Sequence, residues 1–225
     1  MKALLLRFPA TAYVAPFVVF IVLLGLRGYW PFGPAIEYPL RTVLTLGTLL
    51  AASGALFPFK TSRPWSSIAL GVLVFAIWVA PDVVWPHYRE HWLFRNSLLG
   101  MNEQPLRAAP LDDPFFLIFR VLGSSLLVPV IEEFFWRGWF MRWLIRKDFL
   151  AEPLGSYAPT AFWITAIMFA SEHGQYWDVG LAAGLLYNWW MVRTRSLADC
   201  ILAHAVTNAC LAAYVLSAGE WQYWL

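Results

Sequence analysis

Charged residues are scarce in this sequence. Of its 225 residues only 13% are charged, whereas a soluble domain carries about 25%. The net charge is +2 and the basic residues are scattered, so the sequence has no basic patch of the kind that nucleic acids require. A soluble globular protein and a nucleic-acid-binding protein are therefore both excluded.

Cysteine is scarce as well. The two cysteines, Cys200 and Cys210, both lie in the last apolar segment. Ten residues apart on one helix, they would be separated by about 15 Å along its axis, which is too far for a disulfide. We expect two free thiols, and they do not indicate the redox compartment.

Apolar and aromatic residues are abundant. They make up 60% of the chain, with 14 Trp and 17 Phe, and aromatic rings are favoured at the level of lipid headgroups. Helices are the plausible spanning form, because backbone groups in a bilayer need partners within their own segment. The sequence predicts an all-α, polytopic transmembrane bundle with seven to eight membrane helices. The expected segments are 11–26, 40–57, 66–85, 115–131 running on towards 146, 157–173, 178–192 and 197–217.

The stretch from 115 to 146 is longer than one straight span, and Pro129 removes a backbone donor within it, so we expect a kink or break there. Residues 86–114 are the one sizeable loop. Lys2 and Arg7 precede the first apolar run as in a signal peptide, but no convincing small-residue cleavage site follows, so we expect a retained first helix.

Basic residues are distributed unevenly over the predicted loops. With the N-terminus inside, nine lie on the inner side and five on the outer side, which fits the positive-inside rule and predicts a cytoplasmic N-terminus. The inner set is Lys2, Arg7, Lys60, Arg63, Arg142, Arg146, Lys147, Arg193 and Arg195, and the outer set is Arg27, Arg41, Arg89, Arg95 and Arg107.

Two adjacent acids stand inside a predicted span. Ionisable groups in a membrane are costly and are candidates for function. Glu133 and Arg137 are spaced i,i+4 with the acid first, the better order for an ion pair, whereas Glu132 has no basic residue one turn on. The pattern predicts that Arg137 neutralises Glu133 and leaves Glu132 free to act as a base. The alternative is that all three form one structural ion-pair cluster.

Polar residues also occur in two later spans. His173 stands at the end of segment 157–173, where a capping or interfacial role is the alternative to function, and Glu172 beside it is an interfacial acid or a hydrogen-bond partner. His204 and Asn208 are one turn apart and share a helix face. Both can donate hydrogen bonds, which suits an oxyanion; interhelical hydrogen bonding is the alternative.

A further pattern, His87-Tyr88-Arg89-Glu90-His91, fits the zinc-peptidase motif His-x-x-Glu-His. It lies in the outer loop directly after Pro86, and a third metal ligand would have to come from elsewhere in the chain. We interpret it as a chance match.

Taken together, Glu132-Glu133-x-x-x-Arg137, Phe169-x-x-x-His173 and His204-x-x-x-Asn208 resemble the CAAX-protease and bacteriocin-processing family of membrane endopeptidases. The flanking residues agree, and three motifs in order over about 80 residues are specific. Residues 1–110 carry no motif; features such as Tyr38-Pro39-Leu40 resemble the bacterial CAAX-protease-related proteins linked with exosortase sorting systems.

The resemblance implies an eight-helix fold, in one membrane-embedded domain over 1–225 with N-terminal helices and outer loop at 1–110 and a catalytic core at 111–225. It implies peptide-bond hydrolysis in the membrane, without a cofactor, in a bacterial inner membrane and on a peptide or protein substrate. By position, Glu132 would activate water with help from His173. His204 and Asn208 would stabilise the oxyanion, and Glu133 and Arg137 would order the site. An exosortase sorting system is an expected partner.

Three alternatives stay open. The same positions could bind a divalent metal through Glu132, His173 and His204, since zinc accepts two histidines and a glutamate. The charges could belong to a transporter, although no inverted repeat is visible. The chain could also be a non-enzymatic immunity or binding protein on the same scaffold.

Overall fold

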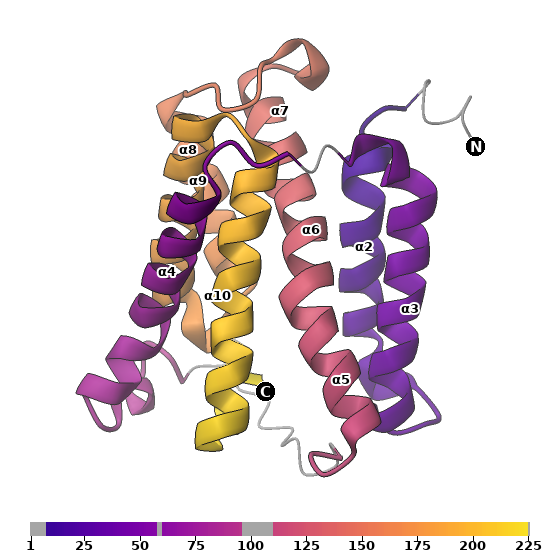
Figure 1. Ribbon diagram of the computed structural model, residues 1–225, viewed down its shortest axis with the longest axis vertical. Helices are drawn as coiled ribbons and strands as arrows, with labels where there is room; N and C mark the ends of the chain where they lie inside the picture. The colour runs from indigo at the N-terminus through magenta and orange to yellow at the C-terminus, as the bar shows by residue number, and fades with distance from the viewer. Residues whose placement is uncertain (1–7, 58–59, 96–109, 225) are drawn as a thin grey trace.

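A computed structural model describes residues 8–57, 60–95 and 110–224, and in these ranges the secondary structure is helical without strands (Figure 1). The helices are α2 (Thr11–Gly25), α3 (Pro34–Ser53), α4 (Pro64–Val84), α5 (Pro114–Leu122), α6 (Val128–Glu133), α7 (Met141–Ile145), α8 (Pro159–Ser171), α9 (Trp177–Thr194) and α10 (Leu197–Ala218).

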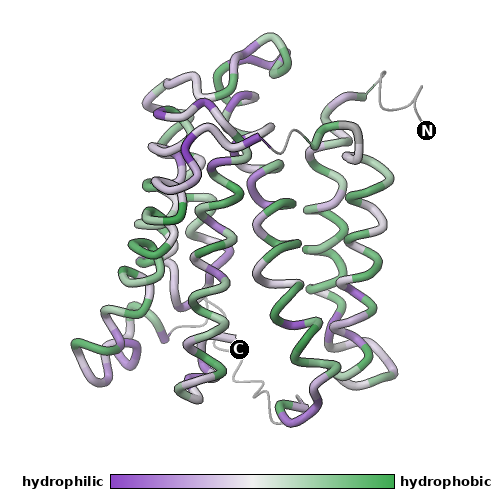
Figure 2. Tube along the Cα trace, viewed as in Figure 1, coloured by the Kyte–Doolittle hydropathy of each residue, from purple (hydrophilic) through white to green (hydrophobic). Residues whose placement is uncertain are grey.

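The all-α prediction is confirmed. Helices α5, α6 and α7 lie within one helical run, Pro114–Ile145, so the described chain passes along the bundle seven times. Three helices are long and apolar enough to cross a membrane: Pro64–Val84, Pro114–Ile145 and Leu197–Ala218; α2 and α8 are shorter apolar helices. Figure 2 shows hydrophobic residues along much of the length of the helices and hydrophilic ones at their ends.

Helix α3 corrects one predicted boundary. It begins at Pro34 rather than at residue 40 and ends at Ser53. Pro34 occupies the first turn, where its missing N–H costs nothing, and Pro39 lies inside the helix.

Of the kink or break expected near Pro129, the break does not occur. The chain is helical from Pro114 to Ile145, and Pro129 sits in the first turn of α6. The distortion takes the form of two π-helical segments, Gly123–Leu127 and Phe134–Phe140, on either side of α6. Widened turns of this kind absorb a change in helical register without interrupting the helix, and they recur at functional sites.

The helices pack as neighbours in a way that places the late segments together. Helix α4 packs along α10, α8 pairs with α9 as an antiparallel hairpin, and α2 and α3 lie against the run that contains α5 and α6 (Figure 1). The core between them is apolar and includes Ile131, Phe134, Phe169 and Tyr187, each about 1% exposed or less.

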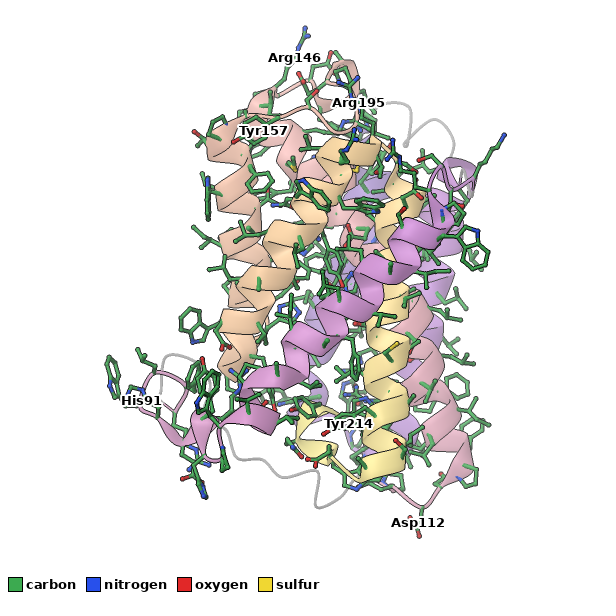
Figure 3. The ribbon with its side chains drawn as sticks, turned by 60° about the vertical axis from the view of Figure 1, so that its left-hand side comes forward. His91, Asp112, Arg146, Tyr157, Arg195 and Tyr214 are labelled. Carbon is green, nitrogen blue, oxygen red and sulfur yellow. The ribbon has the colours of Figure 1, made fainter. Side chains whose placement is uncertain are left out.

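The two ends of the bundle carry different loops. Figure 3 shows Arg146 and Arg195 at one end and His91 and Asp112 at the other. This is the segregation on which the charge-based orientation relies, although Lys2, Arg7 and Arg107 lie outside the described residues. Cys200 and Cys210 are free, as expected.

Close approach of α4 and α10 depends on Gly71. A Cβ built on Gly71 would lie 2.7 Å from Val206 Cβ and would also overlap the backbone carbonyl of Ala203. Small residues at helix contacts in membranes allow this kind of approach. The close approach of the two helices allows Oγ1 of Thr207 to donate a hydrogen bond of 2.9 Å to the Gly71 carbonyl.

We therefore predict that Gly71→Ala destabilises the protein by about 1–3 kcal/mol, as overpacking does in a filled core. Gly47→Ala on α3 is the matched control, because nothing lies within 4 Å of its added Cβ and alanine favours a helix. Thermal unfolding in detergent measures both. Equal melting temperatures for the two variants would contradict the prediction.

Candidate active site

Glu133 and Arg137 form the ion pair that the sequence predicts. Nη1 of Arg137 lies 3.0 Å from Oε1 of Glu133, and neither side chain is exposed. Two further groups complete the shell of Arg137: its Nε donates to Oδ1 of Asn188 at 2.9 Å, and its Nη2 donates to the carbonyl of Gly184 at 3.3 Å. A buried cation is tolerable only with such partners, so α6, the following π-helical segment and α9 are tied together here.

Glu132 lies on a different side of the helix from this pair. Its Oε2 makes no hydrogen bond to the described residues, and Nε2 of His204 lies 3.9 Å from it. Glu132 lines a cavity, and Glu133 does not. The predicted division, with one paired acid and one available acid, is therefore present in the geometry.

His204 is oriented by the paired acid. Its Nδ1 lies 3.0 Å from Oε1 of Glu133, and Tyr187 stacks on the imidazole with ring centroids 5.0 Å apart. A carboxylate can only accept hydrogen bonds, so Nδ1 of His204 carries a proton and Nε2 is directed towards Glu132. The Glu133–Arg137 pair thus fixes the position of the His204 imidazole.

His173 reaches the same place because α8 is short. With 13 residues it extends only about 20 Å, less than a full bilayer core, so the turn after it lies beside the middle of the bundle. Gly180 on α9 leaves room for the ring, since a Cβ there would be 3.2 Å from the Cγ of His173. Nδ1 of His173 donates to the carbonyl of Phe169 at 2.7 Å, which leaves Nε2 of a neutral ring as an acceptor.

Asn208 is held by an irregular stretch of backbone. Its Nδ2 donates to the carbonyl of Ser124 at 2.8 Å, and Ser124 belongs to the π-helical segment Gly123–Leu127. Backbone carbonyls in a π-helical segment accept intrahelical hydrogen bonds less regularly than those of an α-helix. One N–H of the amide is used in this contact, and the second is available to the cavity that Asn208 lines.

These side chains meet at one cavity of about 250 Å³. Of the six residues predicted from the sequence, four line it and the other two, Glu133 and Arg137, lie behind it as the supporting ion pair. The four are Glu132, His173, His204 and Asn208. Three separate late segments therefore contribute to a single site.

Sequence reasoning missed one member of the site. Asn188 completes the shell of Arg137 and also donates to the carbonyl of Phe162 at 2.8 Å; a polar residue in a predicted span was the available signal. Glu172, expected to be interfacial or a hydrogen-bond partner, accepts from Nε1 of Trp136 at 2.9 Å and also lines the cavity.

The pattern at His87 and His91 does not form a metal site. Nδ1 of His87 pairs with Glu90 at 3.0 Å on an exposed loop, and this hydrogen bond lowers the pKa of Glu90. In the described ranges no group of three or more His, Cys, Asp or Glu side chains is arranged to hold a metal ion.

Comparison with known proteins gives one match. Residues 114–210 match the family model described as type II CAAX prenyl endopeptidase Rce1-like, a range that contains all six predicted site residues. No curated protein and no solved structure matches the chain. The finer resemblance to exosortase-associated proteins has no support in these comparisons.

We predict that Arg137→Gln costs about 3–5 kcal/mol of stability, because it leaves Glu133 charged and uncompensated in a dry site. Arg193→Gln, at an exposed position of α9, is the matched control and should change stability by less than about 0.5 kcal/mol. Unfolding in detergent measures both.

The paired variant Glu133→Gln/Arg137→Gln should be more stable than Arg137→Gln alone, because no unpaired charge remains. If the double variant is as unstable as the single one or worse, the ion pair is not the source of the loss.

Proposed function

The helical segment 114–210 belongs to the Rce1-like family of type II CAAX prenyl endopeptidases, and we propose that the protein hydrolyses a peptide bond within the membrane with water activated by Glu132. The observation that carries the proposal is the convergence of Glu132, His173, His204 and Asn208 on one cavity. Three of the four are held in place by one hydrogen bond each to the protein, and Oε2 of Glu132 has no partner among the described residues.

Glu132 is suited to the role of base. Its Oε2 has no hydrogen-bond partner among the described residues, and the side chain lines the cavity, so it can accept a proton from a water molecule there. It accepts a proton as the water oxygen attacks the carbonyl carbon of the substrate. His173 assists, because Nδ1 donates to a backbone carbonyl and Nε2 remains an acceptor. The proton then passes to the amine as the C–N bond breaks.

His204 and Asn208 stabilise the tetrahedral intermediate. Asn208 offers its second amide N–H. The imidazole of His204 is held by Glu133 at 3.0 Å with its Nε2 towards the cavity, where a proton on Nε2 would serve as the second donor. Glu133 and Arg137 contribute by orientation, since they hold His204 without facing the cavity. Donors fixed in advance need no reorganisation during the reaction.

The apolar helices and the family match support an integral membrane protein. We propose that its N-terminus faces the cytoplasm of a bacterial cell membrane, because the positive-inside rule favours that orientation for the predicted loop cations, of which Arg146 and Arg195 lie together at one end of the bundle (Figure 3). The substrate is a peptide or protein at the membrane.

We predict that Glu132→Gln lowers peptide cleavage about 10²–10⁴-fold, the usual contribution of a general base, while the protein remains folded. Glu90→Gln, on the exposed loop, is the matched control and should cleave at the wild-type rate. The assay compares the purified proteins in detergent and identifies the cut site by mass spectrometry. Full biological function in Glu132→Gln would favour a transporter or binding protein instead.

The same assay separates the metal-dependent alternative. Activity should survive dialysis against a chelator, because the proposed steps use protein groups and water alone. Lasting loss that zinc restores would replace the proposed mechanism with one in which Glu132, His173 and His204 are ligands.

Asn208→Ala should lower kcat about 10²–10³-fold, as the loss of one oxyanion donor does in comparable enzymes, with little change in KM. Steady-state kinetics on a peptide substrate measures both constants. An effect on KM alone would mean that Asn208 binds the ground state rather than the oxyanion.

A further inference from the structure

The segment that follows α10 folds back towards the site. Helix α10 ends at Ala218, and Gly219 reverses the chain with φ of 75°, a left-handed conformation that glycine adopts without strain. Trp221–Trp224 then form a single 3₁₀ turn beside the lower part of the bundle (Figure 1). We call these four residues the return segment.

Other elements hold the return segment by its main chain. Nη2 of Arg120, on α5, donates to the carbonyl of Trp224 at 2.6 Å. The hydroxyl of Tyr176, between α8 and α9, donates to the carbonyl of Gln222 at 3.2 Å. Main-chain carbonyls occur in every peptide, so these two donors can hold a backbone regardless of its sequence.

Its aromatic side chains supply additional contacts. The guanidinium of Arg120 lies 5.4 Å from the ring of Trp224, and Trp224 is only 6% exposed. Tyr223 donates from its hydroxyl to Oδ2 of Asp82 at 2.9 Å. The segment is therefore bound by the kinds of contact that a short peptide makes in a groove.

The return segment lies between two cavities. Tyr223 and Trp224 line the cavity that contains Glu132 and His173. Gln222 lines a second cavity of about 260 Å³, which the loop after α4 surrounds. Arg120 also lines the first cavity, so a donor to the main chain and the proposed catalytic groups share one space.

We propose that the return segment occupies the peptide-binding site of this protein, and that a substrate peptide enters by displacing it and takes over the main-chain hydrogen bonds from Arg120 and Tyr176. The ligand class is a short extended or turn-forming peptide with large apolar side chains. That such a peptide is cleaved rests on the proposed function; that it binds does not.

Binding without cleavage tests the proposal. The probe is a fluorophore-labelled peptide with the sequence of Gly219–Trp224, acetylated and amidated so that it carries no terminal charges. Its affinity for the full-length Glu132→Gln protein in detergent is measured by fluorescence anisotropy. The variant Tyr223→Phe/Trp224→Ala weakens the internal competitor, and the probe should then bind up to about tenfold more tightly if the return segment fills the site nine-tenths of the time.

Adding Arg120→Gln to that variant should weaken probe binding about tenfold, because a charge-assisted hydrogen bond is lost. Arg142→Gln is the matched control: Arg142 also donates to main-chain carbonyls, those of Glu152 and Gly138, but at the other end of the bundle. It should leave probe affinity unchanged. Trp189→Ala, on an exposed face of α9, controls for the loss of a tryptophan.

The outcomes separate the two proposals. The inference is overturned if Tyr223→Phe/Trp224→Ala leaves the probe affinity unchanged. It is also overturned if Arg120→Gln and Arg142→Gln reduce the probe affinity equally. The return segment would then have only a structural role in lining the cavity. If the double variant does not fold, Tyr223→Phe alone removes only the contact with Asp82 and must still tighten binding. Absence of cleavage in the wild type, with the predicted changes in probe affinity, overturns the proposed function and not this inference.

Discussion

The structure depends on one constraint: a cation buried in an apolar helix bundle must be fully compensated. Arg137 is 1% exposed and has Glu133, Asn188 and the Gly184 carbonyl as partners. The same carboxylate oxygen of Glu133 that pairs with Arg137 also contacts His204. Compensation of the charge therefore fixes the relative positions of α6, α9 and α10, and the orientation of a site histidine follows from it.

Irregular backbone gives the rest of the site its shape. A regular α-helix engages its carbonyls internally, whereas the π-helical segment before α6 presents the carbonyl of Ser124 to Asn208. The early end of α8 brings His173 to the depth of the bundle at which His204 lies, and the two rings both contact Phe169.

The return segment suggests that the same cavity binds peptides as well as carrying the proposed catalytic groups. If a peptide of the chain itself binds where a substrate peptide binds, access to Glu132 is governed by competition for Arg120 and Tyr176 rather than by the catalytic groups. The apparent affinity of a substrate then depends on how often the segment is displaced. The protein would then select substrate peptides by their ability to replace the main-chain hydrogen bonds of the return segment. The apolar surroundings make these hydrogen bonds strong.

Some of this could be read from the sequence and some could not. The i,i+4 spacing of Glu133 and Arg137 predicted their pair, and the lack of a basic residue after Glu132 predicted its free carboxylate. Both are local relations on one helix, so they are fixed by helical periodicity. Pro129 predicted a kink or a break; the helix is not broken, because widened turns on either side of α6 absorb the lost hydrogen bond. Asn188 escaped notice because its partner lies 51 residues away in the chain.

By itself, the sequence determined the membrane environment, the helical class and the identity of the costly polar residues, since burial in lipid allows few other solutions for so apolar a chain. Only the tertiary structure decided which of those residues share a cavity, which lie behind it and what else enters it. Contacts such as Glu133 with His204 and Arg120 with Trp224 join distant segments, and their geometry is set by how helices of particular length and register pack, which no local pattern encodes.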